Sequence, residues 1–155
     1  MKIHRNKEIS EDGYEMQFQV NILSYYAMME GFAPVLKANA QSRVVNVASN
    51  YAGDLDLSDL FFSRRRYDSN QAYRQAKQAN RMLSWAAADL TTGFKDSGVA
   101  VNACHPGVVT SKLLASLGMQ KGFDQPSKGA ETPLYLALSP EVEGVTGRYT
   151  HEHNS

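Results

Sequence analysis

The spacing of apolar residues along this chain predicts two long helices. In residues 10–37 and again in residues 71–96, apolar or small side chains recur at steps of three and four, which places them on one helix face. Ser10 is the expected N-cap of the first helix. Pro34 lacks a backbone N–H, so we expect that helix to kink or to end near Ala33. The repeating positions are Phe18, Ile22, Tyr25, Met29, Phe32 and Leu36 in the first helix, and Ala72, Ala76, Ala79, Leu83, Ala86 and Leu90 in the second.

Two short apolar runs predict buried parallel strands. RVVNVAS at residues 43–49 and VAVNACHP at residues 99–106 are rich in β-branched side chains and follow polar segments. Shorter elements are expected at residues 110–117 (helix), 127–138 (helix) and 144–149 (strand). Pro133 fits its helix only if it lies in the first turn. Helices that alternate with strands in this way predict an α/β fold with a helix-covered parallel sheet.

Composition narrows the class of protein. The 155 residues carry 16 basic and 16 acidic side chains, and this balance argues against nucleic acid or an anionic membrane as a partner. No apolar run reaches the roughly 20 residues that a membrane span needs. The polar N-terminus has no signal-peptide core, and the single cysteine, Cys104, leaves no internal disulfide, so we expect a cytoplasmic protein. His151 and His153 lack a third ligand nearby, so no metal site is expected.

Three side chains are candidates for acid–base chemistry. Tyr73 and Lys77 are four residues apart and therefore share a helix face. A neighbouring ammonium lowers the pKa of a phenol and so suits it to proton transfer near neutral pH. Ser49 ends a predicted strand, at the sheet edge where α/β proteins bind ligands. Each feature alone has an ordinary explanation, because the pair can be a surface contact and the serine can begin a turn.

Several motifs in order carry a family resemblance. VVNVAS, AYRQAKQAN and VAVNACHPGVV together resemble the short-chain dehydrogenase/reductase family, most closely its retinol-dehydrogenase-like and WW-domain-oxidoreductase-like branch. The similarity runs from Asp12 to Thr150 and corresponds to the C-terminal part of that family's domain. It implies a partial Rossmann-like, doubly wound parallel sheet without the N-terminal strands. Residues 1–10 would form a polar lead, residues 11–150 the family domain and residues 151–155 a tail.

The resemblance also implies roles for individual residues. Tyr73 would be the catalytic acid–base, Lys77 would lower its pKa, Ser49 would orient the substrate oxygen, and Asn21 would support the lysine through water. His105 lies at the mouth of a predicted strand, where it either packs or contacts substrate. The implied cofactor-binding residues are Tyr73, Lys77, Pro106, Gly107, Val109 and Ser111. The implied cofactor is NADP or NAD.

One family feature is missing from the sequence. None of the 11 glycines forms the TGxxxGIG-type turn that approaches the dinucleotide pyrophosphate, and the NNAG segment is also absent. The pyrophosphate therefore has no visible helix N-terminus to bind. The residue that would select NAD or NADP is missing too, and the substrate cannot be identified from these residues.

Two hypotheses follow. The first is an oxidoreductase that transfers a hydride between a nicotinamide cofactor and a small carbonyl or alcohol substrate, with a homodimer implied through the two long helices. The second is a truncated, non-catalytic remnant that acts as a binding or dimerisation module, or a gene fragment.

Overall fold

The computed structural model describes residues 6–39, 41–89 and 93–151. Helices and strands alternate along the described chain, so the predicted α/β class is confirmed. The elements are α1 (Met16–Phe18), the π-helix η1 (Gln19–Leu23), α2 (Ser24–Ala38), β1 (Arg43–Val47), α3 (Ser69–Asp89), β2 (Ala100–His105), α4 (Lys112–Ser116), α5 (Pro126–Leu138), the 3-10 helix η2 (Pro140–Val142) and β3 (Tyr149–His151). Among the described helices, none has the length and apolar character needed to cross a membrane.

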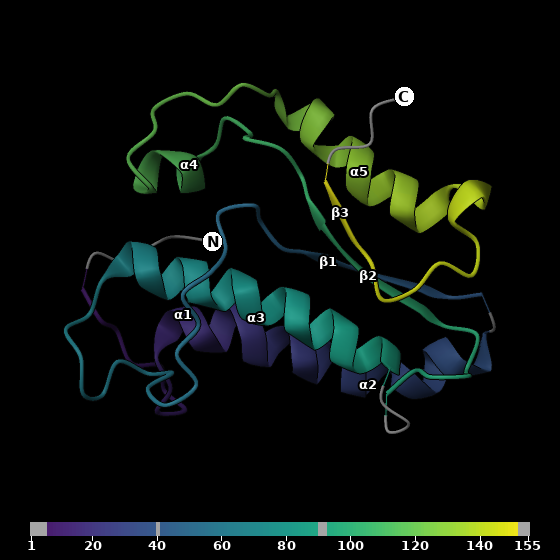
Figure 1. The fold of residues 1–155 in the computed structure, drawn as a ribbon, viewed down its shortest axis with the longest axis horizontal. Helices are drawn as coiled ribbons and strands as arrows, with labels where there is room; N and C mark the ends of the chain where they lie inside the picture. The colour runs from purple at the N-terminus through teal and green to yellow at the C-terminus, as the bar shows by residue number, and fades with distance from the viewer. Residues whose placement is uncertain (1–5, 40, 90–92, 152–155) are drawn as a thin grey trace.

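The sheet has three parallel strands in the order β1-β2-β3. Helices α2 and α3 cover one face and α5 covers the other (Figure 1). Strand β2 is central and buried along its whole length, whereas β1 is an edge strand in the described structure. The register pairs Val47 with Cys104, so β1 and β2 end side by side and deliver the residues that follow them to the same edge.

The backbone of β1 has one side paired and one side open. The amide of Ala48 donates to the Cys104 carbonyl, and the carbonyl of Ser42 accepts from the Ala100 amide. Peptide groups alternate in direction along a strand, so every second residue from Ser42 points toward β2. The peptide groups of Val45 and Val47 therefore point away from β2, toward the outer edge of the sheet.

The apolar core lies between the sheet and helices α2 and α3. Its buried members are Met29, Ala88, Phe94, Val99 and Val101. A buried polar contact ties the same layers together, because Asn46 Nδ2 of β1 donates to Ser84 Oγ of α3 at 2.8 Å. A buried amide needs such a partner, and this one also fixes how α3 sits over β1.

The first helix begins later than predicted. Ser10 is not its cap, since its hydroxyl accepts from the Tyr14 amide at 3.2 Å within a turn. The buried carboxylate of Glu15 takes that role and accepts from the amides of Gln17 and Phe18 at 2.9 and 2.8 Å. A carboxylate can accept hydrogen bonds from two backbone amides, one at each oxygen. Its negative charge is also favourable beside the partial positive charge of a helix N-terminus.

The expected helix end near Ala33 and the expected first-turn position of Pro133 were wrong, whereas a kink at Pro34 stays a prediction. Helix α2 continues through Pro34 to Ala38, and α5 contains Pro133 well beyond its first turn. Each proline removes only one helical hydrogen bond. Near Pro34 the helix surface is exposed, so water can bind the carbonyl that is left over.

The other boundaries moved by a few residues. Asp68 caps α3 by accepting from the Gln71 amide at 2.8 Å, and the described helix runs to Asp89, whereas residues 93–98 form turns and are not helical as expected. The last strand lies at Tyr149–His151 instead of residues 144–149. Leu90, His153 and parts of the expected lead and tail lie outside the described residues.

Two leucines of α5 test the packing of this helix on the sheet. Leu136 is 2% exposed and Leu138 is 75% exposed. We expect Leu136→Ala to lower the free energy of unfolding by about 2–5 kcal/mol, because it leaves a cavity in the core. Leu138→Ala is the matched control and should change it by less than about 0.5 kcal/mol. Urea denaturation measures both, and similar values for the two variants would contradict this packing.

Candidate active site

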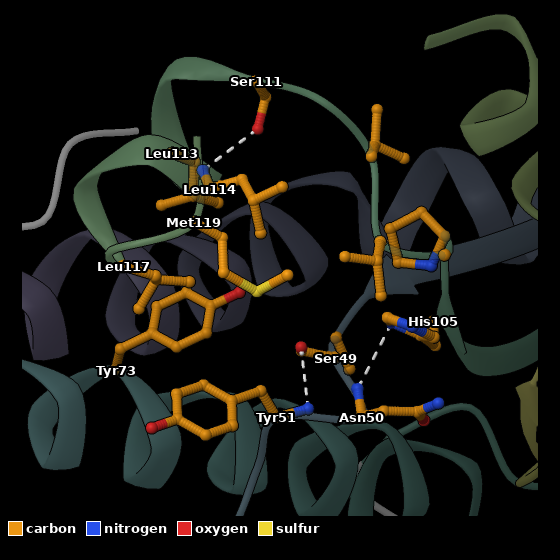
Figure 2. Close-up of a pocket in the computed structure, with 15 residues that line it drawn as sticks. Ser49, Asn50, Tyr51, Tyr73, His105, Ser111, Leu113, Leu114, Leu117 and Met119 are labelled. Carbon is orange, nitrogen blue, oxygen red and sulfur yellow. Dashed lines mark hydrogen bonds between the residues drawn. The ribbon is translucent and has the colours of Figure 1, made fainter. Parts of the chain in front are cut away.

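A cavity of about 740 Å³ opens at the carboxyl ends of β1 and β2. Helix α3 forms its floor, and the segment around α4 forms its opposite wall (Figure 2). The lining residues are Ala48, Ser49, Asn50, Tyr51, Tyr73, His105, Pro106, Gly107, Val108, Val109, Ser111, Leu113, Leu114, Leu117 and Met119. The cavity thus brings together residues from the ends of β1 and β2, from α3 and from the segment around α4.

Ser49 and Tyr73 face this cavity together, as the sequence predicted. Ser49 follows β1 directly, and its hydroxyl accepts from the Tyr51 amide at 3.0 Å. It is also a hydrogen-bonding partner of the Tyr73 side chain. The ring of Tyr51 stacks on that of Tyr73, with centroids 6.3 Å apart. Two hydroxyls therefore lie where one substrate oxygen can contact both.

The pKa of Tyr73 moves in the opposite direction from the one expected. Burial raises it, the contact with Ser49 lowers it, and the nearby Tyr25 raises it again. Removing a phenol from water penalises its charged form. Lys77 is not among the groups that shift the pKa of Tyr73, so the expected lowering is not found.

Lys77 lies beneath the cavity on the same face of α3. Its Nζ donates to the Val47 carbonyl at 2.7 Å and lies 5.9 Å from the centre of the Tyr73 ring. The side chain is only 4% exposed. Burial lowers the pKa of Lys77 to about 8, although the neighbouring Cys104 raises it slightly. The lysine is thus close to Tyr73 but is held by the backbone of β1.

Asn21 is buried in the π-helix η1, and it binds neighbours other than the lysine. Its Nδ2 donates to the backbone and side-chain oxygens of Gln17, each at 3.0 Å. Its carbonyl accepts from Asn80 Nδ2 of α3. A π-turn is common at functional sites because it changes the direction of backbone groups. Here it turns the Asn21 carbonyl toward α3, one turn beyond Lys77.

The predicted cofactor-binding residues after β2 line the same cavity. Gly107 has a φ of +89°, and a Cβ there would lie 2.6 Å from an Asp124 carboxylate oxygen, so this position requires glycine. Asp124 also accepts from the Val108 amide at 2.9 Å. The Asp124 amide donates to the Val108 carbonyl, and the Asp124 carbonyl accepts from the Thr110 amide. The N–H and C=O of Val109 take no part in this pairing.

Ser111 lines the cavity and begins α4. Its hydroxyl accepts from the Leu114 amide at 3.2 Å (Figure 2). This N-cap explains why a hydroxyl residue is needed here, apart from any contact with a cofactor. Leu113, Leu114, Leu117 and Met119 form an apolar wall opposite Tyr73. His105 lines the cavity as well, and its Nδ1 accepts from the Asn50 amide at 3.2 Å.

Sequence reasoning missed three contributors to the site. Tyr51 stacks on the candidate acid–base, and Asn80 holds the Asn21 carbonyl. Arg81 donates to the Ser49 carbonyl. Its place one helical turn after Lys77 was a signal that could have been used, since side chains four apart share a face.

Comparison with known protein families identifies the family of this chain. The family model described as short chain dehydrogenase matches residues 1–122. The chain belongs to the short-chain dehydrogenase family. Mouse (Mus musculus) retinol dehydrogenase 13 is 35% identical over 156 residues, which cover 90% of this chain and 46% of that protein. Human (Homo sapiens) retinol dehydrogenase 14 is 37% identical over 154 residues, which cover 90% and 45%. WW domain-containing oxidoreductase from Danio rerio is 33% identical over 162 residues, which cover 91% and 38%.

Solved structures of other proteins share this fold. A crystal structure of an uncharacterized protein from Mycobacterium Paratuberculosis superposes with a TM-score of 0.74 and 25% identity, covering 97% of this chain and 50% of that one. The 3-ketoacyl-(acyl-carrier-protein) reductase from Brucella melitensis, complexed with NADH, superposes with a TM-score of 0.65 and 20% identity, covering 97% and 62%. The chain spans about half the length of the curated relatives it matches. Its sheet is therefore part of a Rossmann-like sheet, as the sequence indicated.

The buried lysine predicts a pH dependence of stability. Its pKa is 10.5 in the absence of perturbation and about 8 in the folded chain, so between these values the unfolded chain binds a proton that the folded chain does not. Stability must then rise with pH across this window. We expect the unfolding free energy of the wild type, minus that of Lys77→Met, to increase from pH 7 to pH 10. Urea denaturation at each pH measures it, and a flat difference would show that Lys77 is not desolvated.

Proposed function

We propose that this chain provides the catalytic half of an oxidoreductase that transfers a hydride between a nicotinamide cofactor and a carbonyl or alcohol. The observation that carries the proposal is the pair of hydroxyls of Ser49 and Tyr73, which face one cavity at the strand ends with Lys77 beneath. The membership of the short-chain dehydrogenase family supports the same reaction.

Each site residue has its own role in the proposed reaction. The Ser49 hydroxyl donates a hydrogen bond to the substrate oxygen and holds it beside Tyr73. When a carbonyl is reduced, the Tyr73 hydroxyl gives its proton to that oxygen, and it takes a proton back when an alcohol is oxidised. Lys77 lies beside this pair, with its Nζ 5.9 Å from the centre of the Tyr73 ring and bonded to the Val47 carbonyl. The nicotinamide supplies or accepts the hydride when it is bound.

The cavity fits one end of a dinucleotide better than the other. Tyr73 offers a hydroxyl to the ribose, and the turn at residues 106–109 offers backbone groups to the nicotinamide. Lys77 lies one turn further along α3, outside the lining residues, and would add its ammonium to the ribose contact. The sequence contains no glycine-rich turn for the pyrophosphate. NADP or NAD is the proposed cofactor, and we propose that tight binding requires a second half of the kind that the longer relatives contain. The NADH complex of the Brucella reductase supports this class of cofactor.

The chemistry of the cavity wall narrows the substrate. Leucines and a methionine face Tyr73 across the cavity, so the reacting oxygen would be carried on an apolar body. Relatives named retinol dehydrogenase and polyprenol dehydrogenase are consistent with an apolar alcohol. The proposed substrate class is therefore an apolar small-molecule carbonyl or alcohol.

Cofactor binding is the direct test. Calorimetric titration of the 155-residue chain with NADH and with NADPH should give saturable binding if this half assembles a nicotinamide site. If the folded chain binds neither dinucleotide, it is not a catalyst on its own, and the binding-module hypothesis is favoured.

Tyr73→Phe tests whether the Tyr73 hydroxyl transfers the proton. The variant keeps the ring and its stacking on Tyr51 but removes the proton that catalysis needs. In any preparation that shows turnover, we expect kcat to fall by about 100-fold or more. Tyr26→Phe, at an exposed position of α2, is the matched control and should keep full activity. Full activity of Tyr73→Phe would mean that another group transfers the proton.

A second candidate function rests on the exposed apolar side chains of two helices. Helices α2 and α3 cover one face of the sheet, and together with η1 they expose large apolar residues to solvent: Val20, Met28, Phe32, Val35, Met82 and Trp85. Exposed apolar surface marks an association site where it is contiguous. We propose that the chain forms a homodimer through these helices, whether or not it is catalytic.

Phe32→Glu tests this association. Phe32 is 60% exposed, so a carboxylate there is tolerated in a monomer but is desolvated in a dimer interface. Sedimentation analysis should show a dimer for the wild type and a monomer for the variant. Phe123→Glu, at an 85% exposed position far along the chain, should remain dimeric. A wild-type monomer at high concentration would end this proposal.

A further inference from the structure

Arg81 joins the candidate site to the last strand of the sheet. It follows Tyr73 and Lys77 along one face of α3, one helical turn beyond the lysine. Its Nη2 donates to the Ser49 carbonyl and, at 2.8 Å, to the Tyr149 hydroxyl. The guanidinium also lies 3.8 Å from the centre of the Tyr149 ring. A planar, permanently charged group is thus fixed between β3 and the residue after β1.

The residue after Ser49 is held by the same network. The Tyr149 hydroxyl donates to Asn50 Oδ1 at 2.7 Å, and the Asn50 amide donates to His105 Nδ1 at 3.2 Å. On the other side, the Ala48 amide is paired with the Cys104 carbonyl at 2.8 Å. The backbone is therefore anchored to β2 before and after Ser49, and the Asn50 side chain is anchored to β3.

The position of Ser49 itself depends on Arg81. The serine lies just beyond the end of β1, where the register with β2 no longer fixes the chain. Its carbonyl accepts a charge-assisted hydrogen bond from Arg81, which is stronger than a bond between neutral groups. This bond and the bond from the Asn50 amide to His105 hold the two ends of one peptide group, the one that joins Ser49 to Asn50. We expect the orientation of this group to affect whether Oγ faces Tyr73 and the Tyr51 amide.

We propose that Arg81 is a positioning residue for the reaction: it holds the Ser49 backbone so that the serine hydroxyl is presented to Tyr73 and to the substrate oxygen. The proposal rests on the proposed function for its consequence in catalysis. Arg81 acts through Ser49, and no contact of the guanidinium with the Tyr73 hydroxyl is needed. The alternative is that Arg81 only stabilises the fold by clamping β3.

A double-mutant cycle distinguishes these two roles without requiring turnover. The chain is labelled with ¹³C at the tyrosine Cζ, and the Tyr73 signal is assigned by its loss in Tyr73→Phe. Its chemical shift is then compared in the wild type, Ser49→Ala, Arg81→Met and the double variant. Arg81→Met keeps an apolar stem of similar length and removes the fork of donors. Amide exchange at Tyr51 reports on Ser49 Oγ, and exchange at Val101 and Ala103 reports on the sheet.

A positioning role predicts a specific pattern. Arg81→Met should move the Tyr73 signal in the same direction as Ser49→Ala and speed exchange at the Tyr51 amide, while Val101 and Ala103 stay protected. The double variant should show no movement beyond that of Ser49→Ala, and Arg81→Lys should restore part of the wild-type shift. Where turnover is measurable, kcat should fall by about 10- to 100-fold with little change in KM.

Other outcomes would overturn the proposal. If Arg81→Met moves the Tyr73 signal equally in the Ser49→Ala background, Arg81 acts by its charge and not through the serine. If the signal does not move in a folded Arg81→Met chain, Arg81 has only a structural role. If Arg81→Met does not fold, Arg81→Lys and Tyr149→Phe decide, and no movement in either contradicts positioning. An inactive chain that shows the predicted pattern would contradict the proposed function alone.

Discussion

The parallel pairing of β1 with β2 is the constraint on which the site depends. Because the two strands run in the same direction and in one register, the residues that follow them emerge at the same edge. The crossover between them must pass over a face of the sheet, and α3 is that crossover. Ser49, His105 and the face of α3 that carries Tyr73 are therefore brought together by one pairing. Their distance in the sequence has no bearing on their distance in space.

The same packing that assembles the site changes its chemistry. Burial raises the pKa of Tyr73 and lowers that of Lys77, so each group is moved toward its neutral form. The sequence alone indicated only the attraction between a phenolate and an ammonium. It could not show that the ammonium bonds to a backbone carbonyl, which depends on where a strand ends. Desolvation, more than the four-residue spacing, thus determines the proton affinity of this pair.

Periodicity in the sequence was a reliable guide wherever the packing itself is periodic. Strands β1 and β2, helix α3 and the shared face of Tyr73 and Lys77 follow directly from residue spacing. Features that depend on a single contact were not predictable in the same way. Glu15 replaced Ser10 as a cap because its carboxylate is buried near two amides, and Pro34 was tolerated because its surroundings are exposed. The role of Arg81 requires Tyr149, which lies far along the sequence.

One atom, the Val47 carbonyl oxygen, both lies on the outer edge of β1 and binds Lys77. The Val47 carbonyl points away from β2, along the outer edge, and it is the acceptor for the lysine ammonium. A further parallel strand laid along that edge would need the same carbonyl for its own ladder of hydrogen bonds. Strand addition would thus bring an amide to a carbonyl that already accepts from Lys77 and, at 3.4 Å, from the Tyr25 hydroxyl. An ammonium released from this carbonyl would stay close to two phenols, those of Tyr25 and Tyr73, whose ring centres lie 5.8 and 5.9 Å from it.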